Sequence, residues 1–120
     1  MDVKSLYVLA EKEMIKMGFD TFYKGYYYLF IAVLYYLGMG YRKVSLRKEI
    51  YQRIAEEDDV TVESVESCIR NSIDKAWERN ETAFRRAIKE YRGKRRTKPT
   101  NSEMIAIIAS RIRLERIHVI

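Results

Sequence analysis

Apolar residues recur along this chain at steps of three and four, the spacing that predicts amphipathic helices. The first segment carries one such stripe, made of Val3, Leu6, Ala10, Met14 and Met17. Gly18 follows it and is suited to end that helix. Strict alternation of apolar and polar residues, which would indicate strands, is nowhere sustained. The pattern predicts an all-α fold of about six helices, forming a single domain over residues 1–120.

Residues 25–41 form a stretch of 17 residues without a charged side chain. A membrane-spanning helix needs about 20 apolar residues, and the six tyrosine hydroxyls in this stretch would need partners in hydrocarbon. We therefore interpret it as the central helix of the core, with tyrosine hydroxyls reaching its rim. A membrane span is the alternative, and no membrane partner is expected.

Two helices in succession follow a loop at residues 38–43. Ser45 is expected to cap the first, and the acidic run at 56–59 to end it as a solvated turn rather than a metal site. Thr61 is expected to cap the second, which runs to about Arg79. Its apolar stripe is Val62, Val65, Ile69, Ile73 and Ala76. This order is that of a helix-turn-helix, in which the second helix enters the major groove of DNA.

The outward face of that second helix carries side chains able to read base edges. Arginine pairs with guanine, asparagine with adenine, and glutamate with the cytosine amino group, while serine suits bases or phosphate. The residues concerned are Glu63, Ser64, Glu66, Ser67, Arg70 and Asn71. An ordinary solvated helix face has the same composition, so the pattern by itself leaves both interpretations open.

A further helix is predicted over residues 82–91, with Phe84, Ala87, Ile88 and Tyr91 on its inner side. After a basic loop, the string Thr100-Asn101-Ser102-Glu103 predicts a capping box at the start of the last helix. The apolar stripe of that helix is Met104, Ile105, Ile108, Ile112 and Ile117.

The net charge of the 120-residue chain is +6, and it is unevenly placed. Residues 1–60 carry nine basic and nine acidic side chains, whereas residues 61–120 carry 14 and eight. Between residues 85 and 98 there are eight basic side chains and one acidic one. Such a field attracts polyanions, although a solvated loop is the more ordinary explanation. We expect Lys94, Arg95, Arg96 and Lys98 to contact DNA phosphates.

The composition argues against catalysis. One cysteine and one histidine allow neither an internal disulfide nor a cysteine- or histidine-rich metal site. We find no glycine-rich phosphate loop and no pairing of a nucleophile with a base. We expect no enzyme activity, no cofactor and no metal, and the first helix does not have the layout of a signal peptide.

Four stretches of the chain resemble the C-terminal effector domain of the stage-zero sporulation response regulator A. Lys24–Leu29 is similar to that family's Lys-Gly-Tyr-x-Tyr-Leu, and residues 51–55 to its Tyr-Pro-x-Ile-Ala, with Gln52 in place of proline. Residues 65–79 follow its Val-Glu-x-x-Ile-Arg…Ala-Trp-x-Arg helix. Residues 98–103 match its Lys-Pro-Thr-Asn-Ser-Glu string, the most specific of the four, and residues 113–115 its Arg-Leu-Glu.

The resemblance implies a helical, sequence-specific DNA-binding domain that controls transcription during sporulation, and with it a cytoplasmic location. It also implies double-stranded DNA as the partner, with two domains side by side as a homodimer on tandem sites. The family's protein begins with a receiver domain, for which this sequence has no room. We therefore expect either an isolated fragment or a stand-alone relative that phosphorylation cannot control in cis.

The sequence departs from the family where bases would be read. The family has arginines at the positions of Ser64 and Ser67 and a histidine at that of Asn71, while Glu66 and Arg70 remain. Each lost contact between an arginine and guanine removes about 1–3 kcal/mol of discrimination. We therefore expect an altered or looser DNA-site preference. An interaction module that pairs with a full-length regulator is the alternative, using apolar surface of the tyrosine-rich helix and of residues 102–120.

Overall fold

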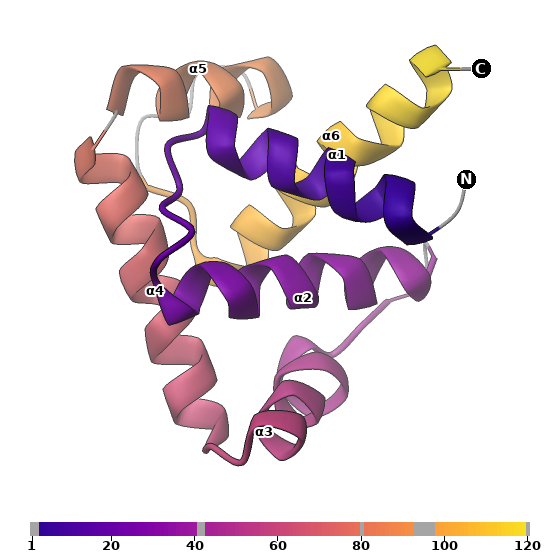
Figure 1. Ribbon diagram of the computed structural model, residues 1–120. Coiled ribbons are helices and arrows are strands. Elements are labelled where there is room, and N and C mark those ends of the chain that lie inside the picture. Colours follow the sequence, from indigo (N-terminus) through magenta and orange to yellow (C-terminus); the bar gives the residue numbers. More distant parts are fainter. Residues whose placement is uncertain (1–2, 41–42, 80, 93–97, 120) are drawn as a thin grey trace.

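A computed structural model describes residues 3–40, 43–79, 81–92 and 98–119, with the side chains of 87–92 and 116–119 outside the description. These residues form helices and no strand, which confirms the predicted all-α class. The elements are α1 (Val3–Lys16), α2 (Lys24–Gly38), the short π-helix η1 (Leu46–Tyr51), α3 (Gln52–Asp58), α4 (Val62–Arg79), α5 (Glu81–Arg92) and α6 (Asn101–Val119). Figure 1 shows α1 and α2 side by side, α4 along one edge, and α6 running behind them.

The core lies around two helices rather than one. The predicted central helix corresponds to α2, which buries Tyr28, Leu29, Ala32 and Val33 and packs against α4, α6 and α1. The last helix is buried on more than its predicted stripe, since Ile107 and Ala109 are also enclosed. Met104, Ile105, Ile108 and Ile112 are buried as predicted. Its apolar surface over residues 104–112 is therefore used inside the fold and is not open to a partner.

Helix ends follow the predicted capping chemistry at two sites and depart from it at a third. The Thr61 Oγ1 accepts a hydrogen bond from the Ser64 N–H at 3.0 Å. At the start of α6, Thr100 Oγ1 accepts from the Glu103 N–H at 3.2 Å, and Glu103 accepts from the Thr100 N–H at 2.9 Å. The prediction for Ser45 is wrong, because its side chain makes no capping bond and its N–H instead donates to Glu49 at 2.7 Å.

Gly25 allows α2 to lie directly against α4. A Cβ placed there would be 1.8 Å from the Cys68 carbonyl oxygen and 2.8 Å from Ser72 Cβ, far inside van der Waals contact. The half-buried Cys68 packs against the core. A glycine at this point therefore sets the spacing between the core helix and the helix that carries the candidate reading face.

Tyrosine hydroxyls at the rim of α2 reach the acidic run at the end of α3. Tyr28 donates to Asp58, which also lies 3.3 Å from the Lys24 ammonium. The Tyr35 hydroxyl is 2.7 Å from Glu57. The acidic residues are solvent-exposed, as expected of a turn, but two of them also fasten α3 to α2.

No helix among the described residues is long and apolar enough to cross a membrane. Nor do those residues hold a group of three or more His, Cys, Asp and Glu side chains that could bind a metal ion.

Candidate nucleic-acid interface

A three-residue turn joins the helical segment 46–58 to α4. Asp59 ends α3 in the left-handed conformation at φ 54°, a backbone geometry that Asp tolerates better than most residues. Its N–H donates to the Ala55 carbonyl, and Thr61 then caps α4. Helix, turn and longer helix therefore follow one another in the order that the sequence predicts, with α4 on the outside of the domain (Figure 1).

The solvent-exposed side of α4 is a polar stripe at steps of four residues. Glu63, Ser67 and Asn71 are exposed, and Lys75 continues the line. Ser64 is half-buried on one flank of this stripe, whereas Glu66 and Arg70 are half-buried on the opposite flank. The six predicted residues thus share the outward half of α4, but they do not all face the same way.

Arg47, from η1, forms ion pairs with two glutamates near the start of α4 and offsets part of their charge. Its guanidinium lies 2.7 Å from Glu63 and forms a second ion pair with Glu66. These hydrogen bonds raise the pKa of Arg47. The pKa of Glu63 is lowered, first by its own backbone N–H and then by Arg47. Carboxylates that would repel DNA phosphates are therefore matched by a cation from the neighbouring helix.

Arg70 is held at the junction between α4 and the end of the basic stretch. Its guanidinium donates to the Pro99 carbonyl at 3.1 Å and to Asp74 at 3.2 Å. The Lys98 ammonium lies 3.0 Å from the same Asp74 oxygen. One carboxylate on α4 thus joins a candidate base-reading arginine to a candidate phosphate-binding lysine.

A further contact fixes the start of α6 against α4. The Asn101 side-chain N–H donates to the Glu66 backbone carbonyl at 3.0 Å. Together with the contacts of Lys98 and Pro99, it places the segment 98–101 along the flank of α4. Lys94, Arg95 and Arg96 lie outside the described residues.

Sequence reasoning missed three residues that organise this surface. Asp74 was detectable, because it stands four residues after Arg70 on the same helix face. Arg47 and Asn101 act through contacts that span 19 and 35 residues of sequence, and no local spacing reveals such pairs.

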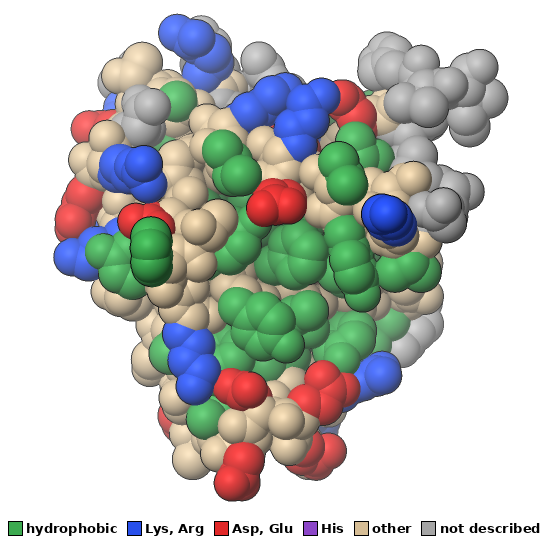
Figure 2. All heavy atoms as spheres, viewed as in Figure 1, with side chains coloured by type: hydrophobic (Ala, Val, Ile, Leu, Met, Phe, Trp, Pro, Cys, Tyr) green, Lys and Arg blue, Asp and Glu red, His purple; other side chains and the backbone are tan. Residues whose placement is uncertain are grey.

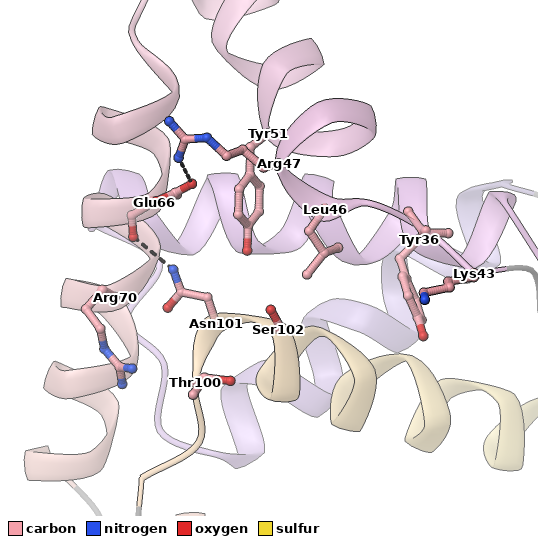
Figure 3. A pocket seen from close by; sticks show the side chains of 11 residues that line it. Tyr36, Lys43, Leu46, Arg47, Tyr51, Glu66, Arg70, Thr100, Asn101 and Ser102 are labelled. Carbon is pink, nitrogen blue, oxygen red and sulfur yellow. Dashed lines mark hydrogen bonds and ion pairs between the residues drawn. The ribbon is translucent and has the colours of Figure 1, made fainter.

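A cleft lies beside this junction, between η1, α4 and the start of α6. Its volume is about 890 Å³. Figure 3 shows Tyr51 entering it from η1, with its hydroxyl directed toward Asn101 and Ser102. Burial raises the pKa of Tyr51 to about 12, with a smaller contribution from Glu66. The lining residues are Tyr36, Lys43, Val44, Leu46, Arg47, Tyr51, Glu66, Arg70, Thr100, Asn101 and Ser102.

An all-helical domain that presents a polar helix after a short turn is typical of the DNA-binding domains of transcription regulators. Comparison with protein families makes the class specific. Residues 10–112 match the family model described as "Sporulation initiation factor Spo0A C terminal". This match covers most of the chain, so the chain belongs to that family of sporulation effector domains, and the resemblance inferred from its sequence is confirmed.

Proposed function

We propose that the chain is a sequence-specific transcription regulator that reads duplex DNA with the exposed stripe of α4 and holds the backbone with the basic stretch. The observation that supports this most directly is the contact of Lys98 and Pro99 with Asp74 and Arg70. A basic segment beside a polar helix face is what a phosphate clamp next to a reading element requires.

The exposure of each residue indicates its proposed role in DNA binding. Ser67 and Asn71 point outward and are proposed to contact base edges, with Ser64 and Glu63 at the margin. Arg70 is proposed to exchange its half-buried pair with Asp74 for guanine or phosphate, while its contact with the Pro99 carbonyl positions it. Glu66 is proposed to contact cytosine only in part, because Arg47 also holds it. Lys94, Arg95, Arg96 and Lys98 would bind phosphates.

We further propose that the DNA element differs from that of typical family members. Ser67 lies on the exposed stripe where the family has an arginine, so a long bidentate donor is missing at the position best placed to reach a groove. The basic stretch then supplies a larger share of the affinity than it would beside an arginine-rich helix.

Selection of bound duplexes from a random pool, at physiological salt, tests both proposals. We expect a defined motif that differs from the family element, and Ser67→Arg should shift the selected motif toward a guanine. Two copies of the motif in tandem would support a homodimer on DNA. Recovery of the unchanged family element would refute the altered preference, and recovery of no motif at all would refute sequence-specific reading.

A second candidate function, pairing with a full-length regulator, is supported by exposed apolar side chains on α1. Figure 2 shows hydrophobic side chains gathered over the face formed by α1 and α2. The exposed members on α1 are Val3, Tyr7, Val8 and Ile15. Most of this surface belongs to a helix that the sequence did not single out.

Co-elution with a full-length regulator of this family tests the second candidate. If α1 is the contact, Val8→Glu with Ile15→Glu should abolish co-elution and leave DNA binding intact. The control is Lys4→Glu, which lowers the charge of the same helix by the same two units without removing apolar surface. If the unaltered chain does not co-elute with the regulator, pairing with a full-length regulator is excluded as a function.

A further inference from the structure

The cleft beside α4 contains two buried polar atoms that lack a hydrogen-bonding partner within the described part of the chain. They are the Tyr51 hydroxyl and the side-chain oxygen of Asn101. Buried polar groups in native proteins are almost always hydrogen-bonded, because leaving one unpaired is costly. Tyr51 is only 4% exposed, yet its hydroxyl points into a cleft rather than into packed core (Figure 3).

The charges around the cleft favour a negatively charged occupant. Lys43, Arg47 and Arg70 line it, against the carboxylate of Glu66. Arg47 also pairs with Glu63, and Arg70 shares Asp74 with Lys98, so these four cations exceed the three carboxylates by one charge. The first turn of α6, a helix of 19 residues, also forms one wall. The start of a helix carries partial positive charge and N–H donors that suit an anion. The capping box already uses the N–H groups of Thr100 and Glu103, so those of Asn101 and Ser102 are the donors concerned. The Tyr51 hydroxyl is protonated at neutral pH, as that of tyrosine ordinarily is, so it can donate.

The size and the remaining lining favour a small organic molecule. A cleft of about 890 Å³ falls in the range of metabolite-sized sites. Leu46 and the Tyr36 ring lie on the side of the cleft away from Arg70 (Figure 3), and Val44 also lines it, so the cleft has apolar surface as well. Asn101 offers an acceptor, because its N–H is already used by the Glu66 carbonyl.

We propose that this cleft binds a small organic anion that also carries a hydroxyl or amino group. Its charged group would lie at the start of α6 and accept from Tyr51, its hydroxyl or amino group would donate to Asn101, and its body would pack on Leu46. The site adjoins the proposed DNA contacts and shares two residues with them. Because Glu66 and Arg70 belong to both, an occupant would also change DNA affinity, a consequence that rests on the proposed function.

Titration of the full chain with 4-hydroxybenzoate, followed by amide chemical shifts and without DNA, tests the site itself. The neutral analogue 4-hydroxybenzamide is the matched ligand control. We expect saturable shifts at cleft residues with the acid and at least tenfold weaker binding of the amide. Because no DNA is present, a failure of the DNA-binding proposal cannot mask or mimic this result.

Two variants separate binding from folding. Tyr51→Phe removes an unpartnered hydroxyl, so it should leave Tm unchanged or raise it. The same substitution should weaken the binding of 4-hydroxybenzoate about three- to tenfold. Ser102→Asp adds a carboxylate to the first turn of α6, so it should raise Tm. The added charge should also weaken the binding of 4-hydroxybenzoate. The controls are Tyr27→Phe and Thr21→Asp, which make the same changes at exposed positions outside the cleft.

The absence of saturable shifts, or shifts that map elsewhere, would overturn the proposal. Equal binding of acid and amide would do the same, as would unchanged affinity in both cleft variants. A parallel titration uses a short duplex of arbitrary sequence. If the duplex moves the cleft signals and the acid does not, the cleft belongs to the DNA backbone interface and the small-anion site is refuted.

Discussion

Gly25 sets the distance between α2 and α4 at the scale of a single residue. Alanine is intrinsically the better helix residue by about 0.5–1 kcal/mol, but its Cβ would meet backbone atoms of Cys68 at 1.8 and 2.6 Å. Backbone cannot move aside as a flexible side chain can, so the clash outweighs the propensity. We expect Gly25→Ala to lower the free energy of unfolding by about 1–3 kcal/mol in urea denaturation.

Gly38 provides the matched control, because it ends the same helix with nothing within 4 Å of an added Cβ. Gly38→Ala should be neutral or stabilise by up to about 1 kcal/mol. Equal effects of the two substitutions would mean that α2 and α4 are not in the close contact described.

Asp58 gives the fold a defined sensitivity to acid. The Tyr28 hydroxyl, and then Lys24, hold the pKa of Asp58 below its ordinary value of 3.8. A carboxylate whose pKa is depressed in the folded state stabilises the fold above its unfolded pKa, and this contribution is lost as the pH falls through the folded pKa. We expect Asp58→Asn to lower Tm at pH 7, and the difference from wild type to shrink below about pH 4.

Thermal unfolding between pH 7 and pH 3 measures this effect. Asp59→Asn removes the same charge one residue further on, away from Tyr28 and Lys24, at a left-handed position that Asn also tolerates. A Tm gap for Asp58→Asn that stays constant down to pH 3 would contradict the contact.

Helix capping is the clearest case at the scale of elements. Thr61 and Thr100 make side-chain capping bonds, whereas Ser45 makes none. We expect Thr61→Ala and Thr100→Ala each to lower the free energy of unfolding by about 1 kcal/mol. Ser45→Ala should change it by less than about 0.5 kcal/mol. Chemical denaturation measures the free energy of unfolding of the three variants. If Ser45→Ala lowered it as much as the two threonine substitutions do, the Ser45 side chain would have to cap η1.

Most elements and their buried faces could be predicted from the sequence because helix periodicity, Gly18 and the Thr100–Glu103 box are local signals. The environment of the candidate site could not. That Arg47 pairs with Glu63, or that Lys98 meets Asp74, depends on which helix flanks face each other after folding. The extent of α6 burial was also underestimated, because its periodic stripe gave no sign that Ile107 and Ala109 would be covered from another side.

The whole molecule separates a balanced scaffold from a basic region. Residues 1–60 carry no net charge, and the surplus of +6 lies entirely in the second half. The contacts of residues 98–101 place the described end of the basic stretch against α4. This arrangement suits a protein whose affinity for DNA is largely electrostatic and whose choice of sequence comes from a few exposed side chains.

Salt dependence follows from that charge distribution. If four cations of the basic stretch meet phosphates, affinity for an arbitrary duplex should fall roughly a hundredfold between 50 and 200 mM salt. Lys98→Ala should reduce the slope of log affinity against log salt by about 0.9. Fluorescence anisotropy at several salt concentrations measures both, with Lys4→Ala on α1 as the control. An affinity that does not change with salt would exclude phosphate binding by this stretch.

The central claim is that α4 reads the sequence and the basic stretch holds the backbone. The most direct test is the ratio of Kd values for the selected duplex and a scrambled one, compared between wild type, Asn71→Ala and Lys98→Ala at fixed salt. We expect Asn71→Ala to reduce this ratio by about five- to 150-fold, with little change on scrambled DNA. Lys98→Ala should raise the Kd for both duplexes by the same factor and leave their ratio unchanged. A ratio that Asn71→Ala leaves unchanged, or that Lys98→Ala alone reduces, would contradict the account.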